Sequence, residues 1–424
     1  MARNLWGRAA LLVVSIGLLP CTSAAAAQGD DGAVVSAWNG ILQSTLPPTA
    51  GLQTPRYYSM MHVAMFDAVN AIEQQYTPFR SKLRAPRGAS TEAAAAQAAH
   101  DVLAALFPAN VAIYDQTLAA QLTGIPPGTS ILGRLVGKKV AAEILAWRFE
   151  DGWHLPPLTY ELPPFPGQYQ RTPPNFPAPG ATQYPGVKPF ALLTATQFLP
   201  SVPPTLNSAA YAEDYNEVKE IGKVDSATRL PEQTQLAQLF AGVITPTSLF
   251  ALWSNVARDV SADQGLSLVD TARLFALMHV SINDGLQTSQ TSKFIFGLWR
   301  PVTAIQRGGE DLNDATAPDA EWLPLLSTPP YPSYAGNMAC VGASAATALA
   351  LGLGTNDVSF NAVWRNTSGP DYVRPYTGFW EMAVDQANSR VYGGIHFRFD
   401  NEASQIVCPK VAQYAFSQYM KPRR

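Results

Sequence analysis

The sequence predicts an all-α protein, and three observations lead to this fold class. Apolar residues recur at helical spacing in many segments, strand-like alternation is scarce, and one long proline-rich stretch interrupts the helices. The chain has 424 residues, of which 47% are hydrophobic and 14% are charged, so it can bury a large core in one or two packed units. We therefore expect helical bundles joined by a long irregular excursion.

The first 27 residues are typical of an export signal. Arg3 and Arg8 form a positive beginning, residues 9–19 are mainly apolar, and small residues follow at 23–27. The apolar run is too short to span a bilayer, and no later segment reaches the length of a transmembrane helix. We expect removal of residues 1–27 and an exported mature protein, either periplasmic or secreted. Cys21 permits a lipoprotein interpretation, but the preceding proline fits that signal poorly.

An N-terminal helical layer is expected over residues 28–153. Apolar periodicity, and an alanine-rich segment that begins after Ser90, predict its helices at 56–72, 91–106, 112–122 and 131–149. Residues 154–205 should form a Pro-rich irregular segment, because 14 of the 35 prolines lie there and proline blocks helix interiors.

The remaining residues, 206–424, are expected to form a C-terminal helical domain that carries the functional site. Helical patterns occur at 207–224, 232–242, 268–284, 336–351 and 379–392. No repeat of fixed period is evident between the two parts. Two comparable helical layers stay open as an alternative.

The overall charge limits the class of partner. A formal net charge of −3 argues against nucleic acid or an anionic membrane surface as the main partner. A strong positive potential must then be local, made by a few placed arginines and lysines. The sequence leaves the oligomeric state open.

Two cations occur in an unusually apolar run. Lys293 and Arg300 are seven positions apart, with five large apolar residues between them and Pro301 directly after. If this segment is helical, seven positions are two turns and both cations project from one face. Cations in such surroundings need an anion, which is either a carboxylate of the protein or a ligand. A buried salt bridge explains this segment, taken alone, about as well as a ligand site does.

A second segment favours the ligand. Arg390 is expected in the last turn of a helix that ends at the glycine pair 393–394, and His396 follows just beyond. A single histidine is more often a packed core residue than a nucleophile or ligand. The chain has only five histidines, however, and this one stands six positions from an arginine.

Together the two segments resemble the superfamily of vanadium haloperoxidases and type-2 phosphatidic acid phosphatases. Lys293 to Pro301 match its Lys-x6-Arg-Pro pattern, and Ser389, Arg390, Gly394 and His396 match its Ser-Arg-x3-Gly-x-His pattern. The first pattern alone is weak, and the two in order are far more specific. The wider sequence, including residues 56–70, resembles the bacterial exported haloperoxidase-like branch.

The resemblance implies a helical-bundle fold and an oxyanion site. His396 would then attack phosphorus in a phosphatase or coordinate vanadate in a haloperoxidase, while Lys293, Arg300 and Arg390 neutralise the oxygens of the anion. The implied cofactor is vanadate, with phosphate as a competing ligand. The implied partners are a small oxyanion, peroxide with halide, or a phosphoester.

One family motif departs from its pattern. The middle motif, Pro-Ser-Gly-His, normally supplies an acid–base histidine, whereas this chain reads Pro332-Ser-Tyr-Ala-Gly-Asn-Met-Ala-Cys. Ser333 and Gly336 remain candidates to offer donors to the anion. Met338 falls where the histidine is expected, with Asn337 beside it, and neither side chain transfers protons. A lost acid–base group typically costs about 10² to 10⁴ in rate.

Several interpretations stay open at this point. The chain is either an exported haloperoxidase-like enzyme, an acid phosphatase acting through a phosphohistidine, or a weakened oxyanion-binding protein. Halide or ester specificity is also open. His279 is the other histidine of the C-terminal half, and we favour a packed position for it over an acid–base role. Cys340 and Cys408 either form one disulfide or are two small buried residues.

Overall fold

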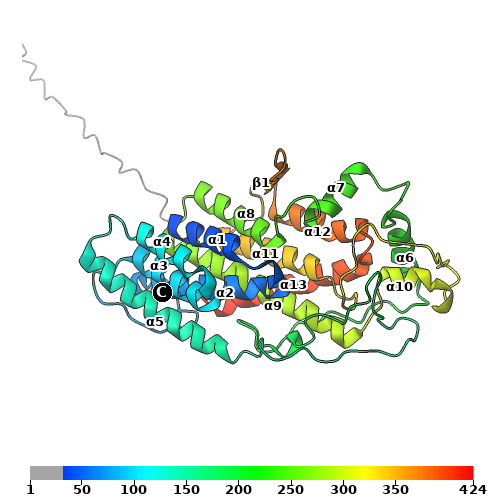
Figure 1. The fold of residues 1–424 in the computed structure, drawn as a ribbon, viewed down its shortest axis with the longest axis horizontal. Helices are drawn as coiled ribbons and strands as arrows, with labels where there is room; N and C mark the ends of the chain where they lie inside the picture. Colours follow the sequence, from blue (N-terminus) through cyan, green and yellow to red (C-terminus); the bar gives the residue numbers. More distant parts are fainter. Residues whose placement is uncertain (1–31, 424) are drawn as a thin grey trace, which may run out of the picture.

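The computed structural model describes residues 32–423, and this part of the chain is largely helical (Figure 1). It contains thirteen α-helices and one two-stranded antiparallel hairpin, so the predicted all-α class is confirmed. The expected export signal lies outside the described residues. Within residues 32–423, no helix has the length and apolar character needed to cross a lipid bilayer. The elements are α1 (Ala33–Thr45), α2 (Thr54–Glu73), α3 (Thr91–Leu106), α4 (Val111–Gln121), α5 (Pro127–Phe149), α6 (Ala209–Ile221), α7 (Pro231–Phe240), α8 (Leu249–Asp263), α9 (Leu268–Phe296), α10 (Pro301–Gln306), α11 (Asn337–Leu353), β1 (Phe360–Trp364), β2 (Tyr372–Tyr376), α12 (Phe379–Tyr392) and α13 (Arg398–Gln418).

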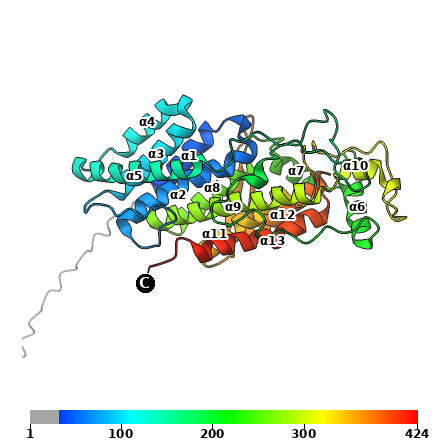
Figure 2. The ribbon, with the colours of Figure 1, turned by 90° about the horizontal axis from the view of Figure 1, so that it is seen from below.

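Two helical bundles share one long central helix. In the first half α2, α3 and α5 pack together, with α1 and α4 against them, and in the second half α9, α11, α12 and α13 pack together. Helix α9 also packs on α2, so it joins the two bundles along the middle of the elongated molecule (Figure 2). Because neighbours cover α9 on several sides, 24 of its 29 residues are buried.

The two bundles repeat one sequence frame that apolar periodicity alone does not reveal. Each half has a buried tryptophan followed by a polar residue on one helix. Its next helix carries an arginine, a histidine six positions later and an aspartate eleven positions after the arginine. In this frame helices α1 and α2 hold the same positions as α8 and α9. The division of the chain into layers or domains stays a prediction. The matching residues are Trp38, Asn39, Arg56, His62 and Asp67 in the first half and Trp253, Ser254, Arg273, His279 and Asp284 in the second.

The two histidines of this frame meet at the centre of the molecule. The ring of His62 stacks on the ring of His279 with 4.9 Å between centroids. Tyr58, four positions before His62, stacks on His279 at 4.5 Å, and Phe275, four positions before His279, packs on His62 at 5.0 Å. Both histidines are completely buried. The packed interpretation of His279 therefore describes its position in the structure.

The two aspartates of the frame hold irregular chain against the helices. Asp67 accepts backbone N–H groups of residues 79–81 at 2.7–2.8 Å, and Asp284 accepts those of residues 190–192 at 2.6–3.0 Å. Three charge-assisted hydrogen bonds satisfy each buried carboxylate. The second set fastens the proline-rich part of the chain to α9.

Between α5 and α6 the chain forms no α-helix or strand, and contains only the 3-10 turn Tyr184–Gly186. This irregular segment nevertheless makes backbone hydrogen bonds with the turn that follows α9. Tyr169 N–H donates to Gly297 O at 2.7 Å, and Trp299 N–H donates to Gly167 O at 2.9 Å. The segment therefore lies against the part of the chain between Lys293 and Arg300.

Two local features help to fix the positions of the helices. Helices α3, α6, α8 and α9 each begin after a serine whose hydroxyl accepts an N–H of the first turn, namely Ser90, Ser208, Ser248 and Ser267. A disulfide joins Cys340 in α11 to Cys408 in α13, with the two Cα atoms 5.4 Å apart. Of the two alternatives open for these cysteines, the structure has the disulfide.

Candidate functional site

Lys293 lies in the last turn of α9, where its side chain is completely buried. Its Nζ donates to Ser333 O at 2.6 Å and also to Ala335 O. Lys293 and Arg300 do not lie on one helix, so the condition for a shared helix face is not met. Gly297 adopts a left-handed conformation, with φ of 60°, and ends α9 three residues before Arg300.

Arg300 directly precedes α10, which starts at Pro301 because proline suits the first turn of a helix. The guanidinium is completely buried and makes three contacts. Nε donates to Tyr331 O at 2.7 Å, and Nη1 lies 2.7 Å from Ile395 O and 3.1 Å from His396 Nε2. Nη2 is buried without a hydrogen-bond partner in the protein. It is one donor suited to a ligand.

Arg390 lies in the last turn of α12, as expected, and is 6% exposed. Its Nη1 donates to Phe240 O at 3.2 Å, whereas its Nε is buried without a partner. The chain then turns through Gly393 and Gly394. Gly394 has φ of +73°, and a Cβ there would lie 2.3 Å from Gly222 O, so glycine is required at this position.

Asp400 is a site residue that the sequence motifs do not identify. Its Oδ2 accepts from His396 Nδ1 at 2.8 Å, from the Ser333 hydroxyl at 2.5 Å and from Phe397 N–H at 3.1 Å. The last of these bonds closes the first turn of α13. The signal in the sequence that could have identified Asp400 is its position four residues after His396. This spacing becomes informative only when a helix is known to start at Arg398.

These contacts define the tautomer of His396. Arg300 can only donate, so Nε2 carries a lone pair and the Nδ1 proton points to Asp400. Burial lowers the pKa of His396 well below its usual value, and the charges of Arg300, Lys293 and Arg390 lower it further. Burial raises the pKa of Asp400 to about 6, against the opposing effect of Lys293. At neutral pH the pair is therefore a neutral imidazole held by a carboxylate.

The buried charges of the site do not balance. Lys293, Arg300 and Arg390 are three cations, and Asp400 is the carboxylate whose charge acts on Lys293 and Arg300. In the described part of the chain, none of the three cations forms a direct ion pair with a carboxylate. Burial is the main reason why the pKa of Lys293 is lowered. Burial is also the main reason why the pKa of Arg390 falls to about 10. A bound anion would relieve this excess positive charge.

Ser333 and Gly336, the two other expected anion donors, are engaged with α13 in this structure. The Ser333 hydroxyl donates to the Asp400 carboxylate, and Gly336 N–H donates to Asp400 O at 2.8 Å. Both residues therefore lie beside the site. Their assignment as anion donors stays a prediction.

The two residues at the altered middle motif begin α11. The Asn337 side chain faces α9, where it accepts from the Ser289 hydroxyl at 2.7 Å and donates to Gln290 Oε1 at 2.7 Å. Met338 is partly buried against the main apolar core, and its carbonyl accepts from Gln386 Nε2. Neither side chain supplies a proton donor to His396 among the contacts described above.

The whole arrangement is chemically suited to an oxyanion. Charged N–H donors, two of them buried and unpartnered, surround one imidazole whose Nε2 lone pair faces Arg300. Within residues 32–423, no group of three or more His, Cys, Asp or Glu side chains is arranged to hold a metal cation. The donor set therefore indicates a small anion that lysine and arginine bind through its oxygens.

Comparison of sequences shows similarity in the C-terminal half of the chain. Residues 273–424 match the family model of the VCPO second helical-bundle domain. This range includes the three cations of the site together with His396 and Asp400. The vanadium chloroperoxidase of Curvularia inaequalis is 25% identical over an alignment of 190 residues, and the match covers 34% of this chain. The match covers 30% of that relative, so the chain aligns with less than a third of its length.

Comparison of structures extends over most of the chain. A solved structure described as the first bacterial vanadium-dependent iodoperoxidase is similar with a TM-score of 0.77 at 21% identity, covering 93% of this chain and 97% of the other. A holo-type bacterial vanadium-dependent chloroperoxidase has a TM-score of 0.69 at 16% identity, covering 92% and 95%. The C-terminal bundle is thus similar to the VCPO second helical-bundle domain, and the chain as a whole has the fold of these bacterial vanadium-dependent peroxidases.

Proposed function

We propose that this protein binds vanadate at Lys293, Arg300, Arg390 and His396 and oxidises halide with hydrogen peroxide. The observation that carries the proposal is the excess of buried positive charge around one imidazole. Burying a cation without a compensating anion destabilises the folded protein by roughly several kcal/mol. The similarity of the C-terminal bundle and of the fold to vanadium-dependent peroxidases favours vanadate among the anions with this charge and shape.

The residues present fit such an anion. Arg300 Nη2 and Arg390 Nε are buried donors without a protein partner, and Lys293 adds a third positive charge. His396 Nε2 is an unprotonated nitrogen directed to the same place, since Arg300 donates to it. Vanadate held by these groups would supply the activation of peroxide that halide oxidation requires.

The chain's own residues keep this site fixed and dry. Asp400 holds the Nδ1 proton of His396 and so keeps Nε2 unprotonated. Backbone carbonyls of Tyr331 and Ile395 fix the Arg300 fork at 2.7 Å each. Burial strengthens every charge interaction, because water is excluded from the site.

The middle motif limits the rate that we expect. Met338 stands where the family has an acid–base histidine, so proton transfer has to pass through water or another group. Turnover should therefore be slow relative to an enzyme that has the histidine. Tight anion binding without turnover is the limiting case of this proposal.

A second candidate function is hydrolysis of phosphomonoesters. The His396–Asp400 pair favours it, because a neutral imidazole with a fixed Nδ1 proton is a nucleophile as well as a ligand. Phosphate has the same shape and charge as vanadate and would compete for the same donors. The two chemistries share the site and differ in whether peroxide is required.

We also propose that the protein works outside the reducing cytoplasm, in the periplasm or as a secreted protein. The Cys340–Cys408 disulfide supports an oxidising compartment. The export signal expected at residues 1–27 supports the same location. Detection of the mature N-terminus in an extracellular or periplasmic fraction, by mass spectrometry, tests this proposal.

One experiment separates the candidate functions. Purified protein is titrated with orthovanadate and with phosphate by calorimetry. The loaded protein is then assayed for bromide and iodide oxidation with peroxide, and the unloaded protein for phosphomonoester hydrolysis. His396→Ala removes the imidazole, and His154→Ala is the matched control because His154 is exposed and outside the site.

The expected result is vanadate binding, with halide oxidation that depends on His396 and is unaffected in His154→Ala. Hydrolysis without peroxide, lost in His396→Ala, would instead support the phosphatase. Binding of vanadate with neither activity above the His396→Ala level would leave an oxyanion-binding protein. If neither anion binds, the proposed site is wrong.

A further inference from the structure

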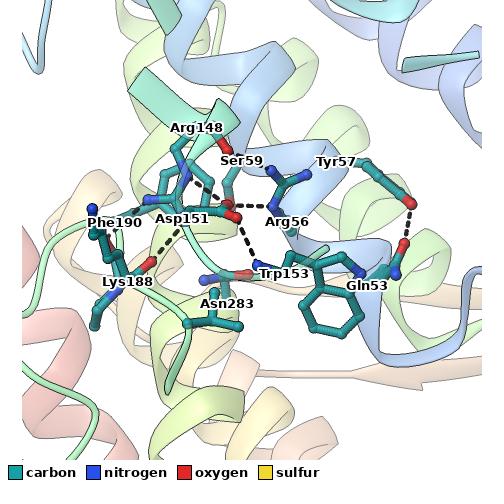
Figure 3. Close-up of polar contacts among 12 residues, drawn as sticks. Gln53, Arg56, Tyr57, Ser59, Arg148, Asp151, Trp153, Lys188, Phe190 and Asn283 are labelled. Carbon is teal, nitrogen blue, oxygen red and sulfur yellow. Dashed lines mark hydrogen bonds and ion pairs between the residues drawn. The ribbon is translucent and has the colours of Figure 1, made fainter. Parts of the chain in front are cut away.

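A pocket lies in the N-terminal bundle, among α2, α3, α5 and the chain that follows α5. Its volume is about 510 Å³, which is within the usual range for small-molecule sites. Figure 3 shows a polar cluster among its lining residues, in which Arg56, Arg148 and the N–H of Trp153 all contact the Asp151 carboxylate. None of the residues lining this pocket belongs to the oxyanion site.

Two arginines share one carboxylate at the base of this pocket. Arg56 Nε and Arg148 Nη2 lie 2.6 and 2.8 Å from the same oxygen of Asp151. The other Asp151 oxygen accepts from Trp153 N–H at 2.9 Å. The cluster of three residues therefore carries one net positive charge.

Arg148 is a structural residue of this cluster. It is 1% exposed, and its remaining donors bind Lys188 O at 2.7 Å and Pro189 O at 3.1 Å. The ring of Phe190 also lies 3.9 Å from its guanidinium carbon. These contacts account for all three of its nitrogens, so Arg148 has little capacity left for a ligand.

Arg56 differs from Arg148 at one nitrogen. Its Nε is bound to Asp151 and its Nη2 donates to Arg148 O at 3.0 Å, but Nη1 has no acceptor in the described part of the chain. The residue is 9% exposed and is one of the residues that line the pocket, so its unused nitrogen is a donor for a ligand bound there. A nearly buried guanidinium with two unused N–H groups matches a carboxylate.

The walls above this edge are apolar. Met60 of α2, Leu106 of α3 and Leu145 of α5 line the pocket, together with Trp153. Phe149 also lines the pocket, and 76% of its surface is exposed. Apolar walls above a single cationic donor suit a ligand with an apolar body and one acidic head.

We propose that this pocket binds a small organic acid, whose carboxylate pairs with Arg56 Nη1 and whose apolar body packs against Leu106, Phe149 and Trp153. The net charge of the cluster selects an anion over a neutral ligand of the same shape. The length of the apolar wall selects a ligand with several carbons over acetate. The proposal is independent of the anion chemistry at His396.

Octanoate is the probe, with 1-octanol and acetate as its two controls. Octanol has the same chain without the charge, and acetate has the charge without the chain. Binding is measured by calorimetry on the full-length protein. Ala105→Trp fills the pocket without altering the Arg56–Asp151 pair, and Ala119→Trp on α4 is a matched control that is exposed and outside the pocket.

The expected result is saturable binding of octanoate that is weakened at least about tenfold in Ala105→Trp and unchanged in Ala119→Trp. Arg56→Gln should weaken it similarly, and Ala105→Trp keeps the test valid if Arg56→Gln fails to fold. Octanol binding as tight as octanoate would overturn the role of Arg56. Octanoate binding that survives in Ala105→Trp, or no binding at all, would overturn the pocket assignment.

Discussion

The ring planes of His62 and His279 lie parallel within 5°, at the point where the two repeated halves of the chain meet. Burial lowers the pKa of His62 to about 3 and lowers the pKa of His279 well below its usual value. Both rings are therefore neutral in the folded protein at neutral pH. The unfolded chain, in contrast, takes up protons near pH 6.5 at these positions.

Acid should destabilise the protein through this pair. A histidine with a depressed folded-state pKa contributes its full stability above pH 6.5, and this is lost as pH falls toward about 3. Between pH 7 and about pH 4.5, His62 should account for about 2 to 3 kcal/mol of lost stability. Urea unfolding of wild type and His62→Phe at both pH values measures this loss. An equal loss in both proteins would contradict the prediction, and His154→Phe is the exposed control.

Arg390→Gln should change ligand binding and stability in opposite directions. Removing one of three buried cations relieves repulsion in the empty site, so the ligand-free protein should melt at the same temperature or higher. Loss of a charge-assisted donor should weaken vanadate or phosphate binding about 10- to 100-fold. Thermal melting with and without anion tests both effects. Arg398→Gln, which breaks a partly buried pair with Glu217, is the matched control and should leave anion binding unchanged.

Met338→His should raise turnover. The substitution keeps the backbone carbonyl that accepts from Gln386, and it returns a proton-transfer group to the first turn of α11. A gain of about 10²-fold or more is expected if the histidine reaches the site. The steady-state rate of the better activity, at equal anion occupancy, is the measurement. An unchanged rate at full occupancy would show that the gap in the motif lies elsewhere.

Gly394→Ala should disrupt the turn that positions His396. The added methyl would lie 2.3 Å from Gly222 O and 2.9 Å from Pro324, in a backbone conformation with φ of +73°. The backbone strain alone costs about 1 to 3 kcal/mol. Anion affinity and melting temperature should both fall. Gly180→Ala, where the space is open, should change neither, and a normal affinity in Gly394→Ala would contradict this role of the turn.

Loss of the disulfide should destabilise the fold strongly. The bond between Cys340 and Cys408 closes a separation of 68 residues, for which chain entropy predicts about 4 kcal/mol. Both residues are buried, so the reductant should act mainly on the unfolded protein. Urea unfolding with and without reductant measures the difference. The double variant Cys340→Ala/Cys408→Ala should not respond to reductant, and a wild-type protein that also fails to respond would exclude the predicted contribution.

Helices with strong local signals are the part of the fold that sequence patterns predict well. The bounds of α3 and α12 agree with the predicted 91–106 and 379–392, because a serine cap or a glycine pair marks an end of each. Helix α9 is longer than the predicted 268–284. Its second half is polar, and those side chains are buried because the irregular segment supplies carbonyl partners, as Tyr184 does for Gln287.

Helix α13 was not predicted, for a related reason. It packs on α9, α11 and α12, so its apolar residues do not form one narrow stripe, and Pro409 lies within it. The helices α1, α8 and α10 and the β1–β2 hairpin were not predicted either. Without α13, the position of Asp400 beside His396 is not visible in the sequence.

The candidate site itself is partly predictable. The structure brings Lys293, Arg300, Arg390 and His396 to one place, although two separate helix ends, and not one helix face, position the first two. Their convergence depends on contacts between segments about a hundred residues apart, such as Arg300 with Ile395 O. Spacing along a sequence does not define contacts of this kind.

The shared position of α9 also determines how the molecule responds to a ligand. This helix packs against helices of both bundles and carries Lys293 in its last turn. Neither half can therefore unfold without exposing buried surface of the other. An anion bound near Lys293 would therefore raise the free energy of the global opening that amide exchange in this helix requires. Slower hydrogen exchange should then extend to α2, which packs on α9 in the opposite half of the chain.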